Sequence, residues 1–196
     1  AIFTCYYKYY LKHILYIPGL GDNSSLTKQR FLLSLWNKNK VIIHFFDPKW
    51  HDESETYAQK YSRLIELGSR LRPGEDDLIV IGVSAGGSLA VRYIAENETV
   101  TRAYLVCGKL KGSSKIGKPY QERAPALLES VQASESLLLD ISESSSAKIT
   151  VIRPLLDGIV PLEDMLVPGS KRVRLFTIGH TISIVYVLIV YLRIRL

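Results

Sequence analysis

Residues 80–87 read Val80-Ile81-Gly82-Val83-Ser84-Ala85-Gly86-Gly87 and hold the pattern Gly-x-Ser-x-Gly around Ser84. An apolar run, residues 78–81, precedes the pattern, and a segment with helical spacing, residues 85–97, follows it. A serine between a strand and a helix must take a strained turn, and glycines on either side avoid collisions with neighbouring backbone. The stretch therefore predicts a nucleophilic serine at the edge of a sheet, with a helix N-terminus directed at it.

Two alternatives for this stretch are a glycine-rich turn of purely structural use and a phosphate-binding loop. A phosphate loop needs Gly-x-x-x-x-Gly-Lys-Ser/Thr and a dinucleotide loop needs Gly-x-Gly-x-x-Gly. Neither spacing occurs around Ser84, so we favour the nucleophile.

A serine nucleophile needs a base, and the chain has four histidines. His13 opens the first predicted strand, at the wrong end of a parallel sheet, and His44 lies inside a predicted strand. His51 follows that strand in a polar loop. His180 lies just past the strand-like run 172–176 and is the best candidate, although a solvated loop or helix-cap histidine is the alternative.

The base in turn needs an acid to orient it. Asp157 lies in the loop that follows the predicted strand 148–152, at the carboxyl end of that strand. An ordinary turn aspartate before Gly158 is the alternative. The loop after the strand 102–107 offers no carboxylate between residues 108 and 112, which favours Asp157.

Four segments together resemble the α/β-hydrolase superfamily, in the order of that family and over nearly the whole chain. They are Pro18-Gly19-Leu20-Gly21, Gly82 to Gly86, Asp157-Gly158-Ile159-Val160-Pro161 and Gly179-His180. The resemblance implies a catalytic triad of Ser84, His180 and Asp157. It also implies an oxyanion hole formed by the backbone N–H groups of Leu20 and Ala85.

Predicted strands and helices alternate along the chain, which indicates an α/β fold with a doubly wound, mostly parallel sheet. We expect about six strands, helices on both faces, and one α/β-hydrolase domain with a reduced cap over residues 1–196. The predicted strands are 13–17, 40–46, 78–81, 102–107, 148–152 and 172–176. The predicted helices are 24–36, 54–71, 85–97, a short one near 161–166, and one at the end of the chain.

The least regular stretch, residues 109–147, is a candidate small lid over the substrate pocket. The alternative is a solvated loop followed by one packing helix. We expect Trp50, His51 and Tyr57 to line the same pocket from the other side.

Charge and cysteine content limit the partners. The net charge of +6 is spread along the chain without a basic face interleaved with aromatic residues, so nucleic-acid binding is not expected. No spacing of metal ligands is present, and we expect neither a metal nor a cofactor. Cys5 and Cys107 are expected to be free thiols, and with no recognisable signal peptide we expect a cytoplasmic protein.

The apolar tail, residues 182–192, is too short for a membrane-spanning helix, which needs roughly 20 residues. We expect a buried final helix packed on the sheet. A membrane-surface contact through residues 182–196, or a dimer interface, is possible but not favoured, and the oligomeric state stays open.

These features predict a serine hydrolase that cleaves a small-molecule acyl ester through an acyl-enzyme intermediate. A thioesterase or an amidase would use the same triad. A non-catalytic binding protein with the hydrolase fold is the alternative from another class, and a lipase-like protein at a membrane surface is a third.

Overall fold

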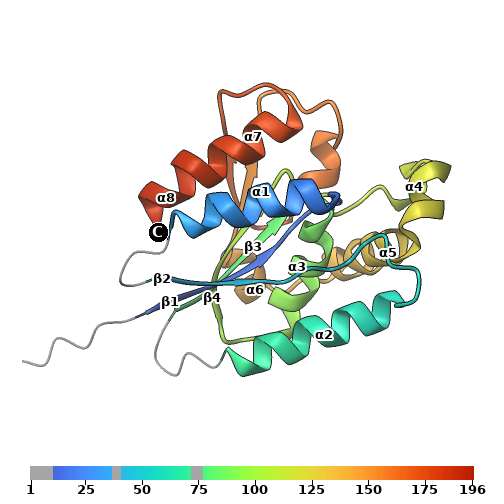
Figure 1. Ribbon diagram of the computed structural model, residues 1–196, viewed down its shortest axis with the longest axis horizontal. Coiled ribbons are helices and arrows are strands. Elements are labelled where there is room, and N and C mark those ends of the chain that lie inside the picture. The colour runs from blue at the N-terminus through green and yellow to red at the C-terminus, as the bar shows by residue number, and fades with distance from the viewer. Residues whose placement is uncertain (1–10, 37–40, 72–76) are drawn as a thin grey trace, which may run out of the picture.

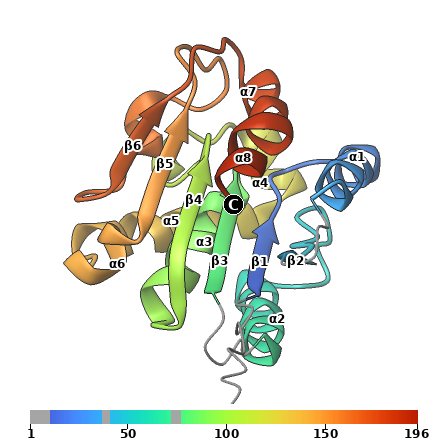
Figure 2. The same ribbon diagram turned by 90° about the vertical axis from the view of Figure 1, so that its left-hand side faces the viewer.

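The structure is a computed structural model that describes residues 11–36, 41–71 and 77–196. Its sheet has six strands in the order β2-β1-β3-β4-β5-β6, and every neighbouring pair is parallel (Figures 1 and 2). Each predicted strand is present, with ends that differ by at most two residues. The strands are β1 Lys12–Ile17, β2 Val41–Phe45, β3 Asp77–Val83, β4 Val100–Val106, β5 Ile149–Arg153 and β6 Lys171–Arg174.

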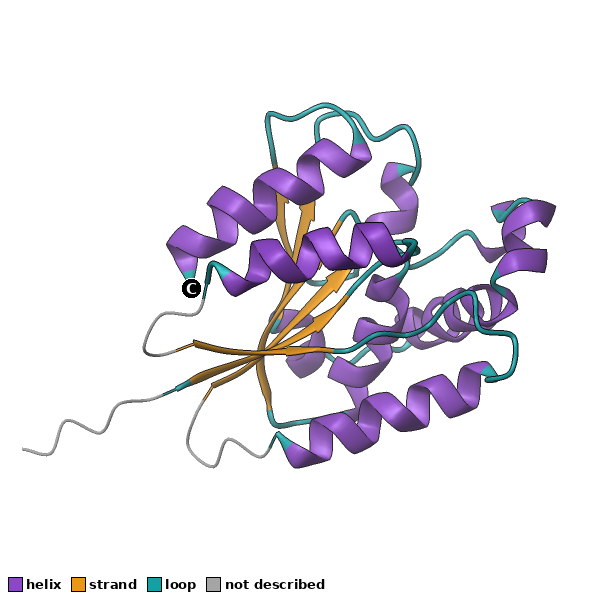
Figure 3. Ribbon diagram, in the orientation of Figure 1, coloured by secondary structure: helices purple, strands orange, loops and turns teal. Residues whose placement is uncertain are grey.

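Helices cover both faces of the sheet, as a doubly wound fold requires (Figure 3). On one face lie α1 (Asn23–Ser34) and a C-terminal helical run of α7 (His180–Tyr186), the π-helical turn η3 (Val187–Tyr191) and α8 (Leu192–Arg195). The other face carries α2 (Tyr57–Arg70), α3 (Gly86–Glu96) and α5 (Pro125–Leu139). Shorter elements are η1 (Ser113–Lys115), α4 (Lys118–Arg123), α6 (Glu143–Ala147) and η2 (Leu162–Met165).

The core is centred on β1 and β3. Ile14 and Leu15 of β1 and Ile79, Val80 and Ile81 of β3 are all fully buried. A central parallel strand is covered on both faces, so it reads as a continuous apolar run rather than an alternating one. That is why residues 78–81 could be recognised as a strand.

Most of the stretch 109–147 belongs to the helical layer. Helix α5 buries Leu127, Val131 and Leu138, and the hydroxyl groups of Ser130 and of Ser88 in α3 lie 2.7 Å apart. Helix α5 therefore packs on α3. A lid over the substrate pocket within residues 109–147 stays a prediction.

The tail forms the expected helix, and it packs on α1 as well as on the sheet. The indole N–H of Trp36 donates to the carbonyl of Leu188 at 2.7 Å. Val187, Leu188 and Leu192 are buried, whereas Ile182 and Ile194 are 65% and 79% exposed. Within the described ranges, no helix has the length and apolar character needed to cross a membrane. Cys5 lies outside these ranges.

The close approach of α3 to β1 gives a first prediction. A Cβ atom at Gly86 would lie 2.3 Å from the carbonyl oxygen of Ile17 and 2.5 Å from that of Pro18, both of them backbone atoms. Gly86→Ala should therefore lower the free energy of unfolding by about 2–3 kcal/mol. Gly158→Ala is the control, because no atom lies within 4 Å of the added carbon. Urea unfolding at 25 °C measures both; equal losses would contradict this packing.

Candidate active site

Ser84 occupies a strained turn between β3 and α3. Its φ angle is +50°, in the left-handed region that residues other than glycine rarely adopt. The Ser84 N–H donates to the carbonyl of Val106 at 3.0 Å, and the Ser84 carbonyl accepts from the N–H of Lys109 at 2.9 Å. A Cβ atom at Gly82 would lie 2.5 Å from the Cβ of Ala90. Packing and hydrogen bonds thus hold the turn that the Gly-x-Ser-x-Gly pattern predicts.

The side chains of Ser84, His180 and Asp157 form one hydrogen-bonded series. Nε2 of His180 lies 2.9 Å from Oγ of Ser84, and Nδ1 of His180 lies 2.8 Å from Oδ2 of Asp157. A carboxylate can only accept, so Nδ1 carries the proton and Nε2 accepts from the serine hydroxyl. The side chains of His180 and Asp157 are only 8% and 4% exposed.

Asp157 is oriented by its own loop. Its Oδ1 accepts the backbone N–H groups of Ile159 at 2.8 Å and Val160 at 2.9 Å. This leaves Oδ2 for the imidazole of His180. The loop therefore fixes the direction in which the carboxylate faces the imidazole.

The loops after β5 and β6 are joined beside this series. Leu156 and Ile178 form a parallel β-bridge, and the N–H of Gly179 donates to the carbonyl of Leu156 at 2.9 Å. Gly179 has a φ of +93°, and α7 begins at the next residue, His180. Asp157 and His180 are therefore held as neighbours, although they are 23 residues apart in the chain.

The loop after β1 lies against the serine. A Cβ atom at Gly19 would lie 2.7 Å from Cβ and 3.3 Å from Oγ of Ser84. Among the loop and turn hydrogen bonds of the described residues, the N–H groups of Leu20 and Ala85 donate none. Both peptide groups therefore retain a donor close to Ser84.

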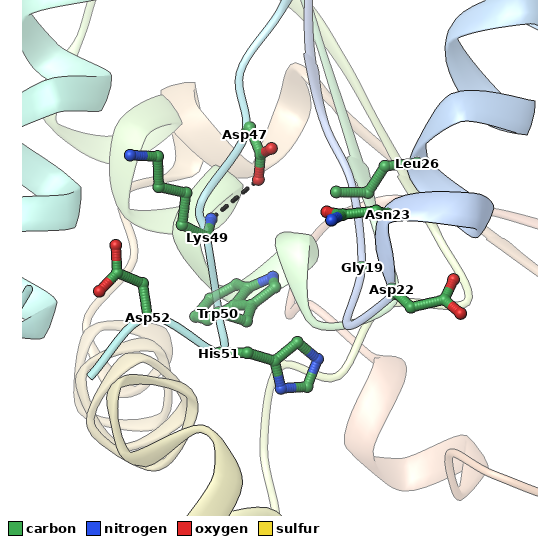
Figure 4. A pocket seen from close by; sticks show the side chains of 10 residues that line it. Gly19, Asp22, Asn23, Leu26, Asp47, Lys49, Trp50, His51 and Asp52 are labelled. Atoms are coloured by element: carbon green, nitrogen blue, oxygen red, sulfur yellow. Dashed lines mark hydrogen bonds between the residues drawn. The ribbon is translucent and has the colours of Figure 1, made fainter. Parts of the chain in front are cut away.

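A cavity of about 510 Å³ adjoins this loop. Gly19, Trp50 and His51 line it, so the structure places two of the three predicted pocket residues there (Figure 4). The remaining lining residues follow β1 and β2 at the carboxyl edge of the sheet, a position that could have identified them. They are Gly21, Asp22, Asn23, Leu26, Asp47, Lys49 and Asp52.

The ammonium group of Lys60 holds one wall of the cavity. It is fully buried and donates to the carbonyls of Lys49 at 2.7 Å and Asp52 at 2.8 Å. Burial lowers the pKa of Lys60. Hydrogen bonds from Ser54 lower the pKa of Asp52, so its carboxylate stays ionised at the cavity wall.

Tyr57, the third predicted pocket residue, does not line this cavity. Its hydroxyl accepts a hydrogen bond from Arg92 at 3.1 Å, and its ring stacks on that of Tyr61. Helix α2 begins at Tyr57 after the cap residue Thr56, and the side chain turns onto α3. The structure thus does not bring Tyr57 together with Trp50 and His51 at this cavity, because sequence position alone does not give side-chain direction.

The other three histidines contact other partners. The rings of His13 and His44 stack, with Nδ1 of His13 and Nε2 of His44 3.0 Å apart. Burial and the neighbouring His13 lower the pKa of His44. Nδ1 of His51 lies 3.3 Å from the carbonyl oxygen of Arg123, at the end of α4. The hydrogen bond to Ser84 thus singles out His180.

Cys107 is an unpredicted neighbour of the series. It follows β4 with a φ of +50° and is a fully buried free thiol. Burial and the charge of Asp157 raise the pKa of this thiol to about 12. Cys107, Asp157 and His180 offer donor atoms within 4.8 Å of one another, the candidate metal group found in the described part of the chain. A metal there would have to displace the proton between His180 and Asp157.

The two loops that precede and contain Asp157 and His180 carry exposed apolar side chains. These side chains are Leu155, Leu156, Ile159, Phe176 and Ile178, of which Phe176 is 91% exposed. The edge of the site is thus apolar on the side of these loops and polar at the cavity beside Gly19.

Several solved structures share this architecture. An α/β hydrolase from the metagenome of lagoon sediments at Mar Chica, Morocco, is 16% identical with a TM-score of 0.62, over 91% of this chain and 84% of that chain. The α/β hydrolase GrgF from Penicillium sp. sh18 is 13% identical with a TM-score of 0.62, over 87% and 83%. A structure from work on LipS and LipT, two metagenome-derived lipolytic enzymes, is 14% identical with a TM-score of 0.62, over 91% and 86%.

Sequence comparison adds nothing to this likeness. No protein-family model and no curated protein matches the chain. At this level of identity the structural likeness shows the fold.

The buried thiol gives a prediction for alkaline pH. An unfolded cysteine ionises near pH ~8.5, whereas burial keeps Cys107 protonated in the folded state. The unfolded state therefore binds fewer protons above this pH, and the free energy of unfolding falls as pH rises from about 9 toward 12. Two variants are compared, Cys5→Ser and Cys5→Ser/Cys107→Ser. Between pH 8 and 10.5, the free energy of unfolding of the variant that keeps Cys107 should fall by about 2 kcal/mol more than that of the double variant. Urea unfolding measures this; parallel losses would contradict it.

Proposed function

We propose that this chain, which has the α/β-hydrolase fold, is a serine hydrolase that cleaves small carboxylic esters through an acyl-enzyme intermediate. The observation that carries the proposal is the hydrogen-bonded series from Ser84 through His180 to Asp157. Ser84 is only part-buried, so its hydroxyl is open to a substrate, while its two partners are nearly enclosed.

In the acylation step, Oγ of Ser84 attacks the ester carbonyl and Nε2 of His180 takes the hydroxyl proton. The imidazolium is stabilised by the Asp157 carboxylate at Nδ1. The tetrahedral oxyanion accepts hydrogen bonds from the N–H groups of Leu20 and Ala85. When the carbon–oxygen bond of the ester breaks, His180 returns the proton to the leaving alcohol.

Deacylation repeats these steps with water. Nε2 of His180 takes a proton from the water that attacks the acyl carbon, and the second tetrahedral intermediate uses the same two N–H groups. The proton then passes to Oγ of Ser84 as the carboxylic acid leaves. The nucleophile of acylation, the base, the acid and the oxyanion donors in this scheme all come from the protein.

The substrate pocket in this proposal is the cavity beside Gly19, because Gly19 also contacts Ser84. Its volume of about 510 Å³ lies in the range of small-molecule sites. A thioester or an amide would meet the same Ser84, His180 and Asp157. A panel of esters, thioesters and anilides of one acyl group separates these alternatives, and we expect the highest kcat/KM on the esters.

A non-catalytic binding protein is the competing proposal from another class. It predicts that Ser84 is no more reactive than an ordinary serine and that no substrate of the panel turns over. The hydrogen bond from the serine to an oriented imidazole favours the enzyme.

Labelling with a fluorophosphonate probe tests the proposed nucleophile and base. Intact mass should show one adduct on the parent protein and none on Ser84→Ala. His180→Ala should label roughly a thousandfold more slowly, because no other group removes the serine proton. Ser136→Ala is the control, because it removes an exposed serine outside the series, and it should label at the parent rate. An adduct that persists in Ser84→Ala, or none on the parent, would refute the assignment.

Kinetics of p-nitrophenyl acetate hydrolysis test the proposed pocket. His51→Ala should raise KM several-fold and leave kcat within about threefold, because the ring lines the cavity and does not touch the reacting atoms. Tyr57→Phe should change neither constant, because Tyr57 lies outside the cavity. A larger effect from Tyr57→Phe than from His51→Ala would place the substrate elsewhere.

A further inference from the structure

A second cavity lies at the opposite edge of the sheet from Ser84. It has a volume of about 630 Å³, and its lining comes from the starts of β4, β5 and β6 and from the end of the C-terminal helical run. The amino ends of parallel strands share one edge, whereas Ser84, Asp157 and His180 follow the carboxyl ends. The cavity is therefore separate from the candidate active site.

This part of the sheet has no helix over one of its faces. In Figure 2, β4, β5 and β6 face the viewer, and α8 lies beside them rather than across them. The register aligns Tyr104 with Thr150 and Thr150 with Lys171, so these three side chains project from the same face. All three line the cavity, and all are polar or charged where a covered face would be apolar.

Five basic residues line the cavity, and none of the described lining residues is acidic. They are Arg102, Lys148, Lys171, Arg172 and Arg195. Arg172 follows Lys171 in β6, so its side chain projects from the opposite face of the sheet. Like charges gathered in one hollow repel one another and attract anions. The chain carries a net charge of +6 overall, so this cluster concentrates much of the excess on one small surface.

The five basic side chains differ in the partners that they contact within the protein. Arg102 pairs with Asp77 at 2.8 Å, and the ammonium of Lys148 donates to the carbonyl of Glu98 at 3.1 Å. The guanidinium of Arg195 lies 4.6 Å from the ring centre of Tyr191. The side chains of Lys171 and Arg172 form no ion pair or hydrogen bond with any residue of the described ranges.

We propose that this cavity binds a small ligand that carries two or more phosphate groups. Guanidinium groups bind phosphate oxygens in pairs, and ammonium groups bind them as point charges. Hydroxyl groups of Tyr104, Thr150 and Tyr191 add neutral donors between the charges. A single phosphate would meet only part of a site with several cations around it, which favours a ligand with more than one phosphate. The proposal does not rest on hydrolase activity.

Isothermal titration with inorganic phosphate and with inorganic tripolyphosphate tests the site. The parent protein should bind one tripolyphosphate at least tenfold more tightly than phosphate, and the affinity should fall as sodium chloride rises from 50 to 200 mM. Lys171→Gln/Arg195→Gln should weaken tripolyphosphate binding at least tenfold. The control Lys28→Gln/Lys118→Gln removes the same charge from α1 and α4 and should keep the parent affinity within twofold.

Sedimentation with vesicles separates a soluble ligand from a lipid headgroup. Vesicles of phosphatidylcholine with phosphatidylinositol bisphosphate are compared with phosphatidylserine vesicles of equal charge. Binding to the bisphosphate vesicles that tripolyphosphate displaces would identify a headgroup; tripolyphosphate binding without vesicle binding would identify a soluble ligand. No tripolyphosphate binding, or equal losses in both double variants, would overturn the site.

Discussion

The left-handed turn at Ser84 is the constraint around which the carboxyl edge of the sheet is arranged. A residue with a side chain in this region costs on the order of 1 kcal/mol or more, so the surroundings must hold it. They do so through the hydrogen bond from Ser84 to Val106 and through the approach of α3 to β1, which leaves no room for a side chain at Gly86. Because the turn is fixed by both neighbouring strands, the serine hydroxyl has one direction relative to the loops that follow β5 and β6.

Those two loops position the partners of the serine as a pair. Leu156 and Ile178 form a bridge between the loops. Asp157 directly follows Leu156, and His180 follows Ile178 by two residues, so the bridge places these two side chains close together. One oxygen of Asp157 is taken up by backbone N–H groups, which leaves the other for His180. The proposed proton relay thus depends on backbone contacts between loops more than on the three side chains alone.

The two edges of the sheet have different physical character, and one helical run connects them. The run starts at His180, beside the candidate active site, and ends with Arg195, beside the basic cavity. Its buried residues Val187, Leu188 and Leu192 pack on the body of the protein. The helical run therefore contributes a side chain to each region, and neither region is complete without it.

Local sequence patterns determined much of this protein. Apolar runs located five of the strands, and the strand-like run 172–176 located β6, which is mostly basic. The glycines around Ser84 located the turn, because that signal lies within a few neighbouring residues. Positions just after predicted strands, together with the resemblance to the α/β-hydrolase superfamily, pointed to Asp157 and His180. The tertiary structure alone decided which side chains meet. It turned Tyr57 away from the cavity, packed α5 on α3, brought Cys107 to Asp157, and gathered five basic residues scattered from Arg102 to Arg195 into one hollow. Strand register and helix packing bring together residues far apart in the chain, and periodicity within a segment contains no record of that contact.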